Sequence, residues 1–65
     1  MAYRVKVEFG LSTRTKDFPK VDEARRSADE LAAFYAPKYG RATTTVYNEA
    51  GEAIYVRVTN ARTLR

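Results

Sequence analysis

The spacing of apolar residues changes period twice along this chain, and this limits the possible folds more than any other feature. Residues 3–9 alternate apolar with charged side chains, which is the two-residue period of a strand with one buried face. From Val21 the spacing lengthens to three and four residues, the period of an amphipathic helix, and after residue 41 it returns to two. The sequence therefore predicts a small α+β domain in which one helix packs on one face of a single-layer antiparallel or mixed sheet.

The segment between the first strand and the helix has two possible structures. Residues 13–17 are polar and rich in threonine, so they suit either a short edge strand paired with residues 3–9 across a turn at Gly10 or a basic surface loop. The residue types do not choose between these two structures. Both the β-α-β-β and the β-β-α-β-β orders therefore stay open.

The helix is predicted to span about 21–36. Asp22 and Glu23 lie in its first turn, where the helix dipole favours negative charge, and Pro37 is expected to end it, with Gly40 free to adopt a positive φ. The apolar stripe consists of Val21, Ala24, Ala28, Leu31 and Tyr35.

The last third of the chain is predicted to form a hairpin of strands 42–48 and 53–60. Asn48 opens a type I turn and Gly51 takes the left-handed position that closes a three-residue loop. Continuous pairing from Asn48 and Glu52 sets Val46 opposite Ile54. This register turns Ile54, Val56 and Val58 to the core, and Tyr55 and Arg57 to the other face.

The topology expected from these elements is a split βαβ unit. A right-handed crossover places residues 42–48 parallel to residues 3–9, and the final strand then lies between them. The helix covers one face, and the opposite face is left bare. The expected core residues of the sheet are Tyr3, Val5, Val7, Phe9, Val46, Ile54, Val56 and Val58. The bare face is expected to carry Arg4, Lys6, Glu8, Thr43, Thr45, Tyr47, Tyr55, Arg57 and Thr59.

The length and composition limit the function. A chain of 65 residues is one small domain, predicted over 1–59 with a frayed basic tail at 60–65, and it buries roughly 60% of its unfolded surface. Histidine and cysteine are both absent, which excludes Ser-His and Cys-His catalysis and the common nitrogen and sulfur metal ligands. We expect no enzyme activity, cofactor, metal or small-molecule substrate. The lack of cysteine and of an apolar N-terminal run favours a cytoplasmic protein without a membrane partner.

The bare face suggests nucleic-acid binding. Tyr47 and Tyr55 on neighbouring strands are suited to stack on unpaired bases, while Arg4, Lys6 and Arg57 are suited to contact phosphates. The formal net charge of +4 favours a polyanionic partner. The preferred interpretation is therefore a non-enzymatic module that binds single-stranded or unpaired nucleic acid.

Two alternatives stay open. The strand over 42–48 is expected at a sheet edge, where Thr43, Thr44 and Thr45 leave its backbone unprotected, so it can pair with a strand of another protein or of a second copy. The chain is then an adaptor, an inhibitor or a homodimer, and the bare sheet face is the other surface at which such a protein partner can bind. Alternatively, Tyr55 with Thr45 and Arg57 with Thr43 are ordinary cross-strand pairs on a solvated sheet without a binding role.

One wider resemblance concerns about half of the chain. The run DFPKVDEARRSADELA, followed by a hairpin with NEAG, resembles the helix and hairpin of many small bacterial and phage proteins of unassigned role. The resemblance implies an accessory or phage-encoded protein. It transfers no functional residue.

Overall fold

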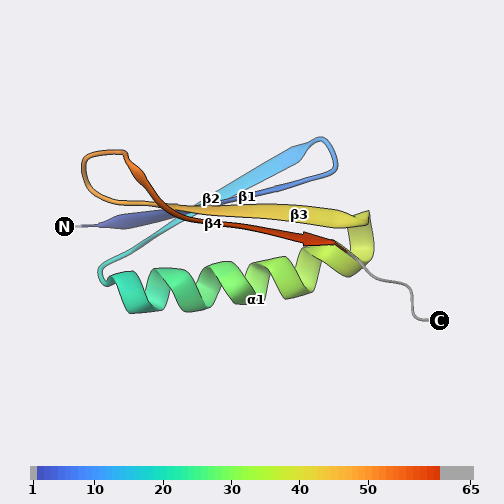
Figure 1. Cartoon of the computed structure of the whole chain (residues 1–65), viewed down its shortest axis with the longest axis horizontal. Helices are drawn as coiled ribbons and strands as arrows, with labels where there is room; N and C mark the ends of the chain where they lie inside the picture. Colours follow the sequence, from blue (N-terminus) through green and yellow to red (C-terminus); the bar gives the residue numbers. More distant parts are fainter. Residues whose placement is uncertain (1, 61–65) are drawn as a thin grey trace.

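Four strands and one helix make up the structured part of the chain (Figure 1). The computed structural model describes residues 2–60. The elements are β1 (Tyr3–Phe9), β2 (Ser12–Phe18), α1 (Val21–Tyr39), β3 (Arg41–Tyr47) and β4 (Ala53–Asn60). The strands form one antiparallel sheet in the order β2-β1-β3-β4, with α1 on one face. The predicted α+β class is confirmed, in its β-β-α-β-β form.

The first hairpin settles the open question about residues 13–17. They belong to β2, which pairs with β1 along its whole length, from Phe9 opposite Ser12 to Tyr3 opposite Phe18. The two-residue loop begins with Gly10 at φ 56°, the positive value that a type II′ hairpin turn requires at this position. Only glycine adopts this φ readily.

The predicted place of β3 in the sheet is wrong. β3 is antiparallel to β1, and it lies between β1 and β4 rather than at an edge. The cause is β2: because β2 reverses the chain before the helix, the crossover joins β2 to β3, and these two run in the same direction with β1 between them. The expected edge-strand pairing at Thr43, Thr44 and Thr45 therefore fails, since β3 already has a partner strand on both sides.

The predicted register of the last hairpin holds only at its loop. Asn48 N–H donates to the Glu52 carbonyl at 2.9 Å, and Gly51 has a φ of 85°, as the three-residue loop predicted. One step further, a β-bulge shifts the pairing: Tyr47 is opposite Ala53, but Val46 is opposite Tyr55. Ile54 is the extra residue, so every later residue of β4 lies on the opposite face from the one predicted.

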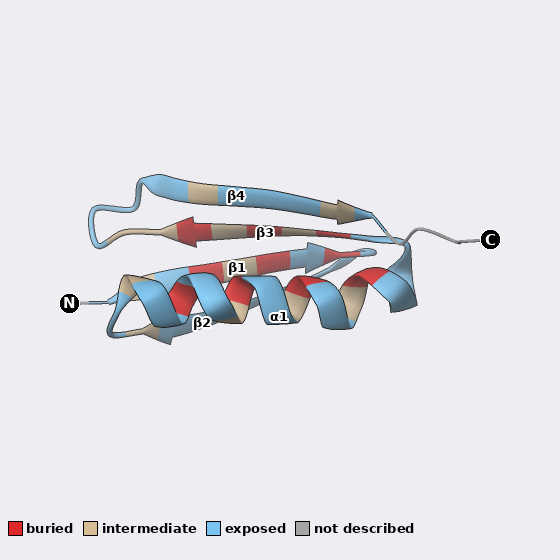
Figure 2. Cartoon of the chain, turned by 60° about the horizontal axis from the view of Figure 1, so that its bottom comes forward, coloured by how far each residue is buried: buried red, intermediate tan, exposed pale blue. Residues whose placement is uncertain are grey.

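The core is narrow and lies between α1 and the two central strands. From β1 and β3 it takes Val5, Val7, Phe9, Ala42, Thr44 and Val46. From the helix it takes Ala24, Ala28, Ala32 and Ala36, a stripe with a spacing of four. Figure 2 shows these buried turns of α1 facing β1 and β3, while β4 at the far side of the sheet is almost wholly exposed. Ile54, Val56 and Val58, which were predicted in the core, are exposed.

The helix ends later in the chain than predicted. The helix continues through Pro37 to Tyr39, because a proline in the last turn removes only one intrahelical donor. Gly40 then ends it with φ 89° and donates its N–H to the Ala36 carbonyl at 2.8 Å. β4 ends at Asn60, as predicted for this strand, and the other residues of the predicted tail, 61–65, lie outside the described residues.

The different burial of β3 and β4 predicts that a Val→Ala substitution lowers the free energy of unfolding more in β3 than in β4. Val46 is fully buried, whereas Val56 is 59% exposed. Val46→Ala should lower the free energy of unfolding by about 1 to 3 kcal/mol, because it leaves a cavity. In solutions dilute enough that copies of the chain do not associate, Val56→Ala should change it by no more than about 0.5 kcal/mol. Urea titrations of both variants make the comparison, and equal losses of stability would contradict this assignment of faces.

Candidate interaction surface

The sheet face away from the helix is open to solvent, and its composition changes from one edge to the other. Alternation along the strands and the observed registers place these side chains there: Thr13, Thr15 and Asp17 from β2, Arg4, Lys6 and Glu8 from β1, Thr43, Thr45 and Tyr47 from β3, and Ile54, Val56 and Val58 from β4. The face is thus charged on β1, neutral and polar over most of β3, and apolar on β4.

The row of apolar side chains on β4 is the most unusual feature of this face. Ile54 is 45% exposed, Val56 59% and Val58 53%. They stand at alternate positions of one edge strand, so they form a continuous line, referred to below as the β4 row. Single exposed apolar residues are common, but a continuous apolar patch on a sheet edge indicates an interaction site.

Two further exposed apolar side chains, those of Phe34 and Tyr39, have a different setting. Phe34 and Tyr39 belong to an aromatic group at the end of the helix: Phe34 packs edge-on against Tyr35 with ring centres 4.9 Å apart, and Tyr39 lies 4.9 Å from Phe9. The Lys38 ammonium stands 4.3 Å from the centre of the Phe34 ring. These rings stack on one another or pair with a cation, whereas Val56 and Val58 of the β4 row have the threonines of β3 as their cross-strand neighbours.

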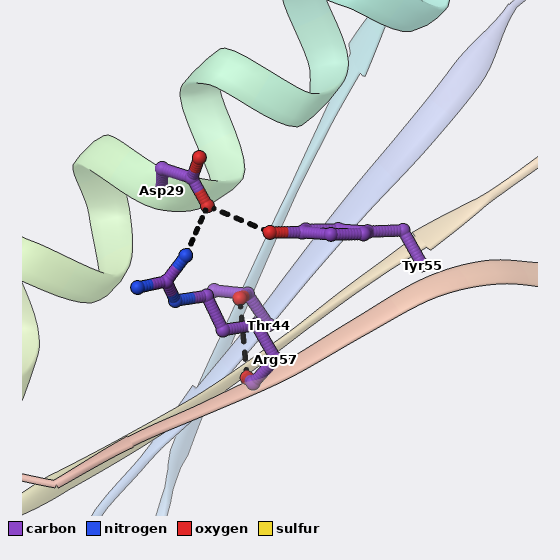
Figure 3. A network of polar contacts seen from close by, with 4 residues as sticks. All are labelled: Asp29, Thr44, Tyr55 and Arg57. Atoms are coloured by element: carbon purple, nitrogen blue, oxygen red, sulfur yellow. Dashed lines mark hydrogen bonds and ion pairs between the residues drawn. The ribbon is translucent and has the colours of Figure 1, made fainter.

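Tyr55 and Arg57 lie on the helix side of the sheet, so their predicted place on the open face is wrong. The Tyr55 hydroxyl donates to Asp29 Oδ1 at 3.0 Å, and Arg57 Nη1 lies 3.4 Å from the same oxygen (Figure 3). The Arg25 guanidinium stands 4.7 Å from the centre of the Tyr55 ring. The pKa of Arg57 is raised, first by polar contact with the Tyr55 side chain and then by the negative charge of Asp29.

The reason for this reversal is the position of β4 relative to the helix. The alanine stripe of α1 lies under β1 and β3, so the part of the helix that faces β4 is its polar flank with Arg25 and Asp29. Side chains that point from β4 toward that flank need polar ends. The bulge at Ile54 supplies this match, because it turns Tyr55 and Arg57 toward Asp29.

Three of the five predicted nucleic-acid-binding residues do come together. Arg4, Lys6 and Tyr47 line a hollow of ≈ 610 Å³ on the open face, beside the loop between β3 and β4. Both cations have anionic neighbours: Arg4 Nε lies 2.9 Å from Asp17 Oδ1, and Lys6 Nζ lies 3.4 Å from Glu8 Oε2. The hydrogen bond with Asp17, and then its charge, raises the pKa of Arg4.

The edge of β4 offers backbone groups as well as side chains. Thr44 Oγ1 donates to the Arg57 carbonyl at 3.3 Å, which shows that this carbonyl points toward β3. In an antiparallel edge strand, backbone groups point inward and outward at alternate residues. We infer that Tyr55, Arg57 and Thr59 direct their N–H and C=O groups to β3, and that Val56 and Val58 direct theirs outward.

Sequence reasoning missed the β4 row, although one signal was present. Alanines at positions 24, 28, 32 and 36 repeat every four residues, which marks a narrow helix face that approaches a sheet closely. Such a narrow contact covers few strands. The alanine pattern thus indicates that the last strand of the sheet lies outside the strip that the helix covers. No residue pattern in the sequence predicts the bulge at Ile54, which determines the face on which the β4 side chains lie.

Other kinds of site find no support in the described residues. Within residues 2–60, no three Asp, Glu, His or Cys side chains gather as a metal site would require. No helix in the described part of the chain is both long and apolar enough to span a membrane.

Comparisons of the chain with protein-family models, curated proteins and solved structures gave no match. Its function is therefore inferred from the geometry.

The Arg4–Asp17 ion pair should affect how Asp17 titrates. The hydrogen bond that Arg4 donates holds the pKa of Asp17 below the ordinary value of 3.8. A carboxylate with a lowered folded pKa stabilises the fold above its unfolded pKa, and this contribution is lost as the pH falls through the folded pKa. Arg4→Gln should therefore raise the titration midpoint of Asp17 in carbon-detected NMR, while Lys6→Gln should leave it unchanged. An unaltered midpoint in Arg4→Gln would refute the assignment.

Proposed function

We propose that this chain is a small non-enzymatic interaction module that receives an extended segment of another polypeptide at β4. The observation that carries the proposal is the β4 row, three exposed apolar side chains on an edge strand. An added strand gains main-chain hydrogen bonds from the edge and side-chain contacts from every second residue. The lack of cysteine suits action in the cytoplasm or another reducing compartment.

The two edges of the sheet differ in how they are protected. β2 carries Arg14, Lys16 and Asp17, and charged side chains on an edge strand oppose pairing with another chain. β4 carries neither Lys nor Pro, and Arg57, its one charged residue, is held toward Asp29 on the helix side. The open-face side of β4 is thus free of charge, which favours β4 as the receiving edge.

A proline at each edge tests the proposal. The Val58 N–H is inferred to point outward, so Val58→Pro removes a donor that an added strand would use, without breaking the ladder to β3. The matched control is Thr15→Pro on β2. Phe9 and Ser12 close a two-residue hairpin, so Ser12 directs its backbone groups toward β1. Because the direction alternates along the strand, Thr15 directs its N–H outward.

The measurement uses random eight-residue peptides displayed against the immobilised chain. Selected peptides should bind Val58→Pro about tenfold more weakly or worse, because a buried acceptor of the peptide loses its donor, and should bind Thr15→Pro as well as the unmodified chain. Circular dichroism checks that both variants fold. Selected peptides that bind both proline variants equally, or a failure to select any from a chain that is monomeric in sedimentation, would count against β4.

The hollow on the open face supports a second candidate, binding of unpaired nucleic acid. Tyr47, Arg4 and Lys6 line this hollow. In this candidate function the Tyr47 ring stacks on a base while Arg4 and Lys6 contact phosphates. Tyr55 and Arg57 no longer contribute, since both face the helix. Asp17 and Glu8 also reduce the positive charge, so this candidate ranks below strand addition.

Fluorescence anisotropy with labelled mixed-sequence oligonucleotides tests this second candidate. Two phosphate contacts should make log affinity fall against log salt with a slope of roughly 1.4, and Arg4→Gln should reduce that slope by somewhat less than one. Tyr47→Ala should weaken binding by about 1 to 3 kcal/mol and leave the slope unchanged, because stacking releases no counterion. No binding at about 100 µM in low salt would exclude it.

A further inference from the structure

We propose that the segment received by β4 is β4 of a second copy of this chain, paired antiparallel about a two-fold axis that passes between the Val56 residues of the two copies. This inference rests on the proposed function, that β4 accepts a strand, and it names the partner and the register. The two sheets join into one continuous sheet, and the interface is isologous, with the same residues contributed by both copies.

The position of the helix leaves room for this pairing. α1 packs beneath β1 and β3, and β4 lies beyond β3 at the edge of the sheet (Figure 2). The β4 edge is therefore not covered by any element among the described residues.

The inward and outward alternation of β4 restricts the register. When two copies of one strand pair antiparallel about a two-fold axis, the sequence numbers of any two facing residues have the same sum, and this sum defines the register. An odd sum would place an outward-pointing backbone group opposite an inward-pointing one, and would set the β4 row beside the polar face of the other copy. Only even sums let the outward backbone groups of the two copies pair with each other and place the two β4 rows on the same face.

Side-chain contacts then choose among the even sums near the middle of the strand. A sum of 114 sets Arg57 opposite Arg57 of the second copy, which is unfavourable for like charges. A sum of 110 sets Val58 opposite Glu52, an apolar side chain facing a charged one. A sum of 112 sets Val56 opposite Val56 and Ile54 opposite Val58, so the whole β4 row finds apolar partners.

The helix side agrees with the sum of 112. In this register Tyr55 faces Arg57 of the second copy, and Arg57 faces Tyr55. An arginine beside a tyrosine ring on a neighbouring strand is a favourable pair. Each Asp29 already binds both side chains within its own copy, so the two networks become neighbours across the axis.

The first test is the mass of the chain in solution. Sedimentation equilibrium should give twice the chain mass of 7.4 kDa at high concentration and a fall toward the monomer on dilution. Val58→Pro should weaken association about tenfold or more, while Thr15→Pro should leave it unchanged. A chain that stays monomeric, or a dimer indifferent to Val58→Pro, overturns the proposal.

The second test reads the register. Residues that do not exchange hydrogen bonds across an antiparallel pair have their α-protons close together. In a mixture of labelled and unlabelled chain, isotope-filtered NOE spectra should therefore connect the α-protons of Tyr55 and Arg57 between copies. A contact between Tyr55 and Thr59 would indicate the sum of 114, one between Ala53 and Arg57 the sum of 110, and either would overturn the register.

The two proposals can fail separately. If the chain is monomeric but selected peptides bind it and lose affinity for Val58→Pro, then β4 receives a foreign strand and only the dimer is wrong. If the chain is monomeric and such peptides bind Val58→Pro equally well, then β4 is not a receiving edge and both are wrong.

Discussion

Four alanines of α1 lie against β1 and β3, and this close contact determines how the rest of the sheet is arranged. Alanine has a short side chain, so the helix approaches the sheet closely and packs over a narrow strip. The fully buried side chains opposite it are also small, with Val5, Val7 and Val46 among the largest. A helix in this position covers the centre of the sheet well and leaves its last strand beyond the apolar stripe.

The orientation of β4 follows from that position. Had the hairpin continued in regular register, the Ile54, Val56 and Val58 side chains would point toward the polar flank of the helix at Arg25 and Asp29. The bulge avoids this conflict by turning Tyr55 and Arg57 to Asp29, where each gains a polar partner. The consequence is a row of apolar side chains in solvent. The contact of Tyr55 and Arg57 with Asp29 thus leaves the apolar β4 row exposed on the open face of the sheet.

The sequence predicted what depends on local pattern and failed on what depends on contacts between distant elements. The periods of residues 3–9 and of the helix, the glycine at position 40 and the Asn48–Gly51 loop were all correct, because neighbouring residues determine them. The place of β3 depended on whether β2 formed, which its polar residues do not decide. The face of β4 depended on one extra residue at Ile54. Since alternation has a period of two, that residue moved Tyr55 and Arg57 out of the candidate site.

The small size of the domain gives the β4 row a further meaning. A chain of 65 residues buries a low fraction of its surface, and this core consists mostly of alanine and valine. Ile54, Val56 and Val58 are therefore apolar side chains that the fold of a single copy leaves partly in solvent. Pairing β4 with another strand places part of that area in contact and occupies the free backbone groups of the edge. Because a partner that binds only the folded chain also shifts the folding equilibrium toward it, association at β4 and stability of the fold are thermodynamically linked.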